Sequence, residues 1–290
     1  MGNLARTVSR GHTFLESPRW HLGDLYVSDF FTNRVLRFKQ GSSDCEVVLE
    51  VPGIPSGLGF LPDGSLLVVS MRDRCIMRFG DGQTTVHADL RRHSRYPLND
   101  MFVDPRGRCY VGGLGHTDGD ESDFGAQPLI VVQVDGSVHT VDAELNFPNG
   151  IVGDGTHLYV AETYAGAVRV FEVDANGTPH SPRIWAQFGQ RPESFDIEEA
   201  HQRLAMEPDG LALSSDGTLW VADAKGHGVS RVREGGEIID FVETAPLSVF
   251  AATESDDGKS LYMCCSPPNR TVDWSKLNAS ELRVAEIGCT

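Results

Sequence analysis

The stretch "PDGLALSSDGTLWVAD" (residues 208–223) has two close relatives earlier in the chain, "PSGLGFLPDGSLLVVS" (residues 55–70) and "PNGIVGDGTHLYVAET" (residues 148–163). Each opens on Pro-X-Gly, passes through a glycine-containing turn and ends in a short apolar run typical of a strand. The X residue changes from Ser56 to Asn149 to Asp209 while its surroundings persist. The pattern predicts a repeated β unit with one variable position.

Six apolar triplets extend the repeat over the chain. They are Leu25-Tyr26-Val27, Leu66-Leu67-Val68, Cys109-Tyr110-Val111, Leu158-Tyr159-Val160, Leu219-Trp220-Val221 and Leu261-Tyr262-Met263. Successive triplets start 41, 43, 49, 61 and 42 residues apart, which is the period of one four-stranded propeller blade. Only a short stretch near "SFDIEEAHQRL" (residues 194–204) is typical of a helix. We therefore expect an all-β chain folded as a six-bladed β-propeller.

The ends of the chain are expected to meet in one blade. A strand near "ARTVSRGHTF" (residues 5–14) and the C-terminal "ELRVAEIG" (residues 281–288) complete the sixth unit, which makes residues 1–290 a single domain. Two units carry long inserts, residues 113–128 and 183–207. Loops of this length are either functional lids or disordered excursions.

Composition limits the classes of partner. The formal net charge of −16 and the lack of a Lys/Arg cluster argue against nucleic acid, and no apolar run is long enough to span a membrane. The six cysteines have neither zinc-finger nor disulfide-framework spacing. We expect a cytoplasmic protein with reduced thiols that acts on a small molecule or a cation; the oligomeric state stays open.

The variable position lies nine or ten residues before each triplet. We call it the slot; its residues are Glu16, Ser56, Asn99, Asn149, Asp209 and, in the sixth unit, a residue near Ala251. Equivalent positions of a radial repeat lie at one radius, so these side chains are expected to converge on the central axis. Carboxylate and amide oxygens are the ligands of a hard divalent cation. The alternative is that Asn149-Gly150 and Asp209-Gly210 are ordinary turn dipeptides.

The ordered phrases "ESPRW", "PSGLGFLPDGSLLVVSMRD", "LNDMFVDPRGRCYVG", "FPNGIV" and "PDGLAL" resemble the senescence-marker-protein/gluconolactonase (regucalcin-like) family. The resemblance covers about residues 14–265. It implies a six-bladed propeller with one axial divalent metal and lactone-hydrolysing activity. It places the metal ligands on Glu16, Asn149 and Asp209, and a substrate- or water-contacting residue on Asn99. Calcium or zinc is the expected ion, with manganese and magnesium as alternatives.

One position departs from that family. Sugar-lactone members have a substrate-binding arginine where this chain has Pro97, with Arg95 nearby. Proline cannot replace a guanidinium fork, so we expect a lactone less hydroxylated than gluconolactone. Apolar side chains in the inserts either line the pocket mouth or pack the inserts onto the propeller: Leu114, Phe124, Trp185, Phe188 and Phe195.

The expected reaction is hydrolysis of a lactone by water attack on a metal-polarised carbonyl. Asp209 is the candidate base. His116 and His201, in the two inserts, either reach the channel mouth or are simply solvated, and no Gly-x-Ser-x-Gly motif supports serine catalysis. The alternatives are another metal-dependent esterase or isomerase on the same site, or a non-catalytic propeller that binds a ligand or partner.

Overall fold

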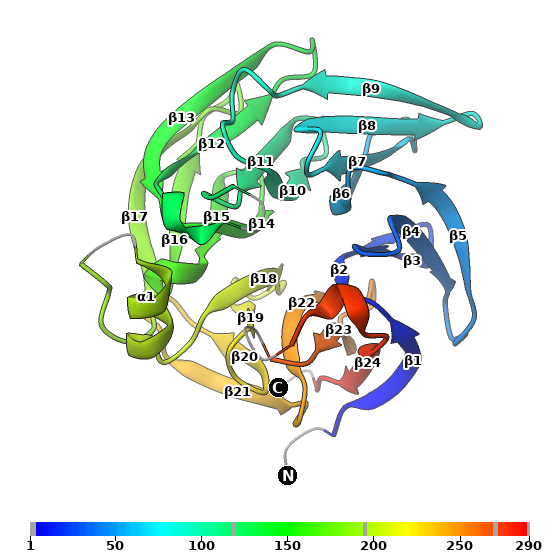
Figure 1. The fold of residues 1–290 in the computed structure, drawn as a ribbon, viewed down its shortest axis with the longest axis vertical. Helices are drawn as coiled ribbons and strands as arrows, with labels where there is room; N and C mark the ends of the chain where they lie inside the picture. The colour runs from blue at the N-terminus through cyan, green and yellow to red at the C-terminus, as the bar shows by residue number, and fades with distance from the viewer. Residues whose placement is uncertain (1–3, 118–119, 194–195, 269–271, 289–290) are drawn as a thin grey trace.

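Six four-stranded sheets surround a central axis in the computed structural model (Figure 1). The structure describes residues 4–117, 120–193, 196–268 and 272–288. Every pairing inside a sheet is antiparallel, and the strands of blades 1 to 5 follow one another in chain order from the axis outward. The predicted all-β six-bladed propeller is confirmed.

The blades are numbered from the first complete one. Blade 1 is β2 (Leu15–His21), β3 (Asp24–Asp29), β4 (Arg34–Lys39) and β5 (Cys45–Glu50). Blade 2 is β6 (Pro55–Phe60), β7 (Leu66–Ser70), β8 (Cys75–Gly80) and β9 (Gln83–Asp89). Blade 3 is β10 (Leu98–Val103), β11 (Cys109–Gly113), β12 (Gln127–Val132) and β13 (Val138–Leu145). Blade 4 is β14 (Pro148–Gly153), β15 (His157–Glu162), β16 (Ala167–Val173) and β17 (Pro179–Gln187). Blade 5 is β18 (Pro208–Leu213), β19 (Leu219–Asp223), β20 (Gly228–Val232) and β21 (Ile238–Glu243). Blade 6 is β22 (Ser248–Glu254), β23 (Ser260–Ser266), β24 (Ser280–Glu286) and β1 (Arg6–His12).

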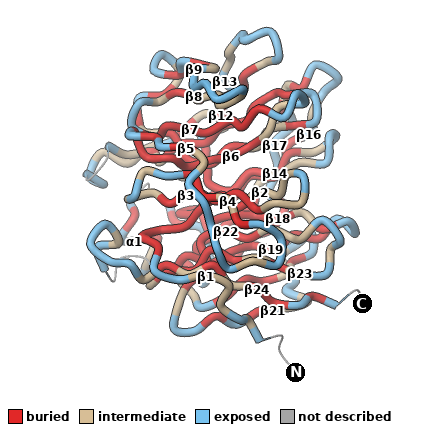
Figure 2. Tube along the Cα trace, turned by 90° about the vertical axis from the view of Figure 1, so that its right-hand side faces the viewer, coloured by how far each residue is buried: buried red, intermediate tan, exposed pale blue. Residues whose placement is uncertain are grey.

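The apolar triplets form the second strand of every blade. Both faces of these strands are buried, as in β7 and β19, because each blade packs against a neighbour on either side. Six clusters of buried apolar side chains follow, one at each contact between adjacent blades. Figure 2 shows the buried strands through the body of the molecule and the exposed turns at its margins. The core therefore forms a ring that holds the inner strands in place.

The ring closes as the sequence predicted. β1 at the start of the chain pairs with β24 near its end, from Arg6 opposite Val284 to His12 opposite Ser280. The sixth sheet thus has the order β1-β24-β23-β22, and the closing blade joins strands from both ends of the chain.

The helical segments are short. One α-helix, α1 (Ile197–Arg203), falls in the predicted acidic stretch, and the 3-10 turns are η1 (Glu121–Asp123), η2 (Thr163–Ala165) and η3 (Trp274–Lys276). The predicted insert 183–207 begins too early, because residues 183–187 complete strand β17. Within the described part of the chain, no helix has the length and apolar character needed to cross a membrane.

Candidate metal centre and substrate pocket

The slot residues lie at the start of the six inner strands, where the pairing register breaks. In blade 5 the partners jump from Pro208–Asp223 to Leu211–Val221, which leaves Asp209 and Gly210 outside the ladder. The breaks in blades 2, 3, 4 and 6 likewise leave the slot residue outside the ladder. In blade 1 the break comes one residue later, because Glu16 pairs with Ser28. A local bulge re-aims the side chain of the residue it contains, so the repeated phrase encodes a bulge that turns one side chain toward the axis.

The sixth slot residue is Phe250. The break in β22 falls between Val249 and Ala251, and Phe250 lines the axial pocket. The slot predicted near Ala251 is thus its neighbour Phe250, because a fixed offset from the triplet does not account for the different bulge in this blade. The slot set contains an aromatic ring as well as oxygen donors.

The small residue after the slot allows neighbouring inner strands to approach closely. A Cβ at Gly150 would lie 2.5 Å from the Asp209 carbonyl oxygen, and one at Gly210 would lie 2.6 Å from the Cα of Ala251. Both distances are below any normal contact, so glycine is required there by close packing. The turn interpretation of the Asn-Gly and Asp-Gly dipeptides is therefore wrong: both lie in β strands at the axis.

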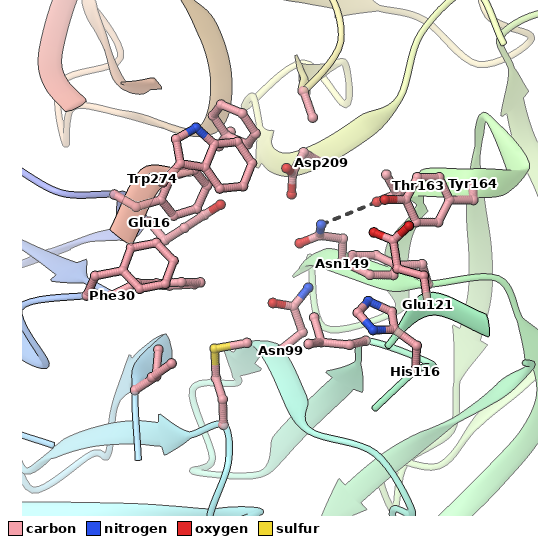
Figure 3. A pocket seen from close by; sticks show the side chains of 18 of the residues that line it. Glu16, Phe30, Asn99, His116, Glu121, Asn149, Thr163, Tyr164, Asp209 and Trp274 are labelled. Atoms are coloured by element: carbon pink, nitrogen blue, oxygen red, sulfur yellow. Dashed lines mark hydrogen bonds between the residues drawn. The ribbon is translucent and has the colours of Figure 1, made fainter. Parts of the chain in front are cut away.

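Four of the five oxygen-bearing slot residues converge on one pocket of about 260 Å³. They are Glu16, Asn99, Asn149 and Asp209, and Figure 3 shows their polar groups facing a common space. All four are buried. Ser56 does not line this pocket; its hydroxyl instead donates to Asn99 Oδ1 at 3.4 Å.

A neighbouring hydroxyl sets the orientation of the Asn149 amide. Asn149 Nδ2 donates to Thr163 Oγ1 at 3.3 Å, and Thr163 Oγ1 in turn donates to the Pro208 carbonyl oxygen at 2.8 Å (Figure 3). Because the amide nitrogen is engaged with Thr163, the Oδ1 atom of Asn149 is left to face the pocket. Sequence reasoning missed Thr163, which lies in η2 directly after β15.

The two carboxyl groups of the site are costly to ionise on their own. Burial, reinforced by the negative charge of Asp100, raises the pKa of Glu16 to about 8. Burial, reinforced by the charge of Glu16, raises the pKa of Asp209 well above its usual value. Two buried carboxyls that repel each other are stable as anions only beside a compensating positive charge.

The donor set fits a divalent cation. Glu16 and Asp209 supply carboxylate oxygens, Asn149 supplies an amide oxygen, and hard cations take this combination with water completing the shell. Asp209 Oδ1 is buried without a hydrogen-bond partner among the described residues, which marks an acceptor that lacks its ligand. The described residues hold no cluster of three or more His, Cys, Asp or Glu side chains suited to a metal, so the fit depends on the amide donors.

A polar network joins the residues that follow two of the slots. Asp100 Oδ1 accepts from Ser17 Oγ at 2.9 Å and from the Arg19 guanidinium at 3.0 Å. Ser17 and Asp100 directly follow the slot residues Glu16 and Asn99, so the network ties blade 1 to blade 3. The network holds in place the strand segments that carry Glu16 and Asn99.

The walls of the pocket are largely aromatic. Phe14, Phe30, Phe31, Phe250 and Trp274 form one cluster with Ala224. Phe147 and Tyr164 lie on another side, with ring centroids 5.1 Å apart. Sequence reasoning missed all seven aromatic residues. A usable signal existed for Phe14 and Phe147, which lie two residues before a slot, at the position equivalent to Pro97.

The candidate residues of the two inserts lie in different parts of the structure. Leu114 and His116 line the pocket, and so does Glu121 from the same insert. Trp185 and Phe188 instead pack between blades 4 and 5. Phe124 packs beside a cluster of Tyr164, Ile197, Ala200 and Leu204 that supports the pocket wall from behind. Phe195 lies outside the described residues.

Two further candidate side chains, His201 and Arg95, lie outside the pocket. His201 does not line the pocket; its Nδ1 lies 2.6 Å from Glu207 Oε1. Arg95 does not replace the guanidinium missing at Pro97, because it is exposed and pairs with Asp123 at 3.5 Å. An exposed arginine from another blade, Arg72, does reach the pocket.

A larger hollow of about 780 Å³ lies at the opposite ends of the inner strands, near Arg19, Phe102 and Glu254. None of the slot residues lines it. Size alone would favour this hollow, but the convergent donors favour the smaller pocket.

Fold and site together define a class: a six-bladed propeller with an axial pocket whose floor presents buried carboxylate and amide oxygens. Residues 14–269 match the family described as SMP-30/Gluconolactonase/LRE-like region, and the chain belongs to that family.

Characterised relatives span most of the chain. Pentonolactonase XacC of Haloferax volcanii is 29% identical over 267 residues, which cover 90% of this chain and 84% of that protein. A gluconolactonase of Zymomonas mobilis is 29% identical over 222 residues, 72% of this chain and 57% of that protein.

Solved structures show the same fold. A luciferin-regenerating enzyme superposes with a TM-score of 0.80 at 19% identity, covering 99% of this chain and 96% of its own. A calcium-binding regucalcin from Agrobacterium tumefaciens superposes with a TM-score of 0.78 at 18% identity, with the same coverage.

Proposed function

We propose that this chain is a lactonase, a hydrolase that opens a cyclic ester with water. The observation that carries the proposal is the convergence of Glu16, Asn99, Asn149 and Asp209 on the floor of one pocket. Relatives named pentonolactonase, gluconolactonase and 6-deoxy-6-sulfogluconolactonase support the reaction class.

In this proposal Glu16, Asn149 and Asp209 hold one divalent ion. Calcium or zinc is the first candidate, with manganese or magnesium as alternatives, since an all-oxygen site that leaves room for water discriminates weakly. When bound, such an ion polarises an ester carbonyl and makes water more acidic. It also offsets the repulsion between the two buried carboxylates.

The remaining steps belong to the protein's own side chains. Asn99 would hold the ester or the attacking water by hydrogen bonds. Asp209 would also accept the proton as water adds to the acyl carbon. The ring C–O bond then breaks, and the proton passes to the leaving alkoxide, which gives a hydroxy acid.

A panel of sugar, aliphatic and aryl lactones, assayed by pH-stat with and without chelator, tests this function. We expect ring opening that chelator abolishes and a divalent ion restores. Metal analysis should find about one divalent ion per chain after reconstitution. Hydrolysis that persists in excess chelator would exclude the metal-dependent route, and no hydrolysis of any lactone would exclude the function.

A further inference from the structure

The positions just above the metal-binding floor carry apolar side chains in four consecutive blades. The residues two positions before the slots of blades 1 to 4 are Phe14, Ile54, Pro97 and Phe147. Three of the four, Phe14, Ile54 and Phe147, line the pocket. On the side of blades 1 to 4, a ligand that reaches the floor therefore passes apolar side chains, whereas blades 5 and 6 have Glu207 and Ser248 at the equivalent positions.

Two of these side chains are held there at a cost in backbone strain. Ile54 and Phe147 have φ values of 69° and 55°, and each precedes a proline at the start of an inner strand. Positive φ is unfavourable for large side chains and especially for β-branched isoleucine. Strain of this kind persists where the surrounding structure enforces it and is concentrated at ligand sites.

One wall of the pocket is a cluster of aromatic rings in tilted and edge-to-face contact. Phe14 is its centre, with its ring centroid 4.4 Å from that of Trp274 and 4.8 Å from that of Phe250. Phe30 adds a further ring at 5.2 Å from Phe14. Trp274 is fixed from behind, because its Nε1 donates to the Pro267 carbonyl oxygen at 3.0 Å. These contacts hold the rings against one another, and all four line the pocket.

The opposite wall is different in character. Figure 3 shows Trp274 and Phe30 on one side of the open space, and His116 and Glu121 on the other. His116 Nδ1 lies 2.9 Å from the Thr117 carbonyl oxygen, so it must be the donor, and the His116 ring stacks on Phe147 with an interplanar angle of 22°. On that side Phe147 and Tyr164 alternate with the polar groups of His116 and Glu121, whereas the Trp274 side is built of aromatic rings without a charged group. A ring in the ligand therefore fits best on the Trp274 side.

We propose that the preferred substrate is an aryl-fused or aryl-substituted lactone whose aromatic ring packs against Phe14, Phe250 and Trp274 while its ester lies over Asn99 and Asp209. This inference rests on the proposed lactonase function and names its substrate class. A cavity of about 150 Å³ accepts benzene, so the 260 Å³ pocket has room for an aromatic ring beside a lactone ring. Aromatic stacking provides selectivity beyond the apolar area buried.

The test compares three lactones with a six-membered ring: dihydrocoumarin, an alkyl δ-lactone and δ-gluconolactone. The wild-type protein is expected to prefer dihydrocoumarin. Trp274→Leu keeps an apolar side chain but removes the ring, so the KM for dihydrocoumarin should rise about tenfold with little change in kcat. Trp274→Phe should restore most of the preference. Trp20→Phe is the matched control and should change neither KM nor kcat. The Trp20 indole is half-buried in β2 and lies outside this pocket.

A binding experiment separates this inference from the lactonase function. The lactam analogue of dihydrocoumarin cannot be opened readily, and calorimetry measures its binding without turnover. Binding that Trp274→Leu weakens about tenfold, without hydrolysis of any lactone, would support the aromatic site and overturn the lactonase function. Hydrolysis with a preference for δ-gluconolactone would support the function, overturn the aromatic substrate and point to Arg72 instead. Neither binding nor hydrolysis would overturn both.

Discussion

At the scale of single residues, the site depends on a few oxygen atoms held where water cannot reach them freely. Asp209 is 5% exposed and Glu16 is 9% exposed. Both are carboxyls whose anionic form is disfavoured by burial. A single oxygen lost from this set therefore removes charge and geometry together.

We expect Glu16→Gln, Asn149→Ala and Asp209→Asn each to reduce kcat/KM at least about 100-fold. The reason is that removal of one ligand weakens binding of the ion and misplaces the ester. Asp209→Asn should retain part of the metal affinity while losing the proton acceptor. Steady-state kinetics and metal titration check both statements. Glu237→Gln is the control, since this exposed carboxylate does not line the pocket. Full activity in Asp209→Asn would contradict its assigned role.

Thr163 is expected to act on the ion through Asn149. Thr163→Val removes the acceptor for Asn149 Nδ2 and frees the amide to rotate, so metal affinity should fall about 10- to 100-fold. Thr163→Ser keeps the hydroxyl and should bind metal as the wild type does. Isothermal titration measures both affinities, and circular dichroism verifies the fold. Equal loss in both variants would show that packing of the methyl group, rather than the hydrogen bond, is what matters.

At the scale of elements, the inner strands are spaced by glycine. Gly150→Ala would place a Cβ 2.5 Å from the Asp209 carbonyl oxygen and 2.6 Å from the Leu211 backbone nitrogen. We expect this substitution to lower the free energy of unfolding by about 1–3 kcal/mol, because backbone atoms cannot move aside without shifting a strand. It should also reduce metal affinity, since Asp209 lies at the point of contact.

Thermal and denaturant unfolding measure the effect of Gly150→Ala. Gly125→Ala provides the control, since its Cβ would meet nothing within 4 Å and its φ is not in the left-handed region. Equal stability of the two variants would mean that the inner strands are free to separate.

The elements also show what the sequence could and could not predict. Triplets and turns predicted the blades because each strand obeys a local rule of alternation and turn chemistry. Asn149 and Asp209 were found because the repeat itself marks them. Trp274 was not found, because it belongs to an irregular segment before β24, and no period relates it to Phe14, the ring it contacts 260 residues away.

The sixth slot shows the limit of counting. Phe250 and Ala251 differ by one position, and a strand displaced by one residue turns the opposite side chain to a given face. The bulge that decides between them is set by pairing with β23, which is a tertiary contact. Periodicity therefore predicts the slot to within one residue, and only the register identifies the side chain that faces the pocket.

At the scale of the whole molecule, the closing blade of the described chain is completed by the pairing of β1 with β24. Deletion of residues 1–12 would remove β1 and leave β24 as an unprotected sheet edge. Such an edge is a template for pairing with another chain. We expect Tm to fall by about 10 °C, from the loss of several kcal/mol of pairing and burial, and the truncated protein to associate in light scattering.

Deletion of residues 1–4 is the matched control, because it keeps β1, which begins at Arg6, and Ala5, which packs against the core between blades 5 and 6. The axial pocket is lined by none of residues 4–12, so the molecules of the longer deletion that remain folded should bind metal with unchanged affinity. In that case the β1–β24 pairing determines the stability of the ring, whereas the slot residues determine what the pocket binds. An unchanged Tm after removal of residues 1–12 would mean that the contacts between blades hold the ring without the β1–β24 pairing, and a parallel loss of metal affinity would mean that closure also shapes the site.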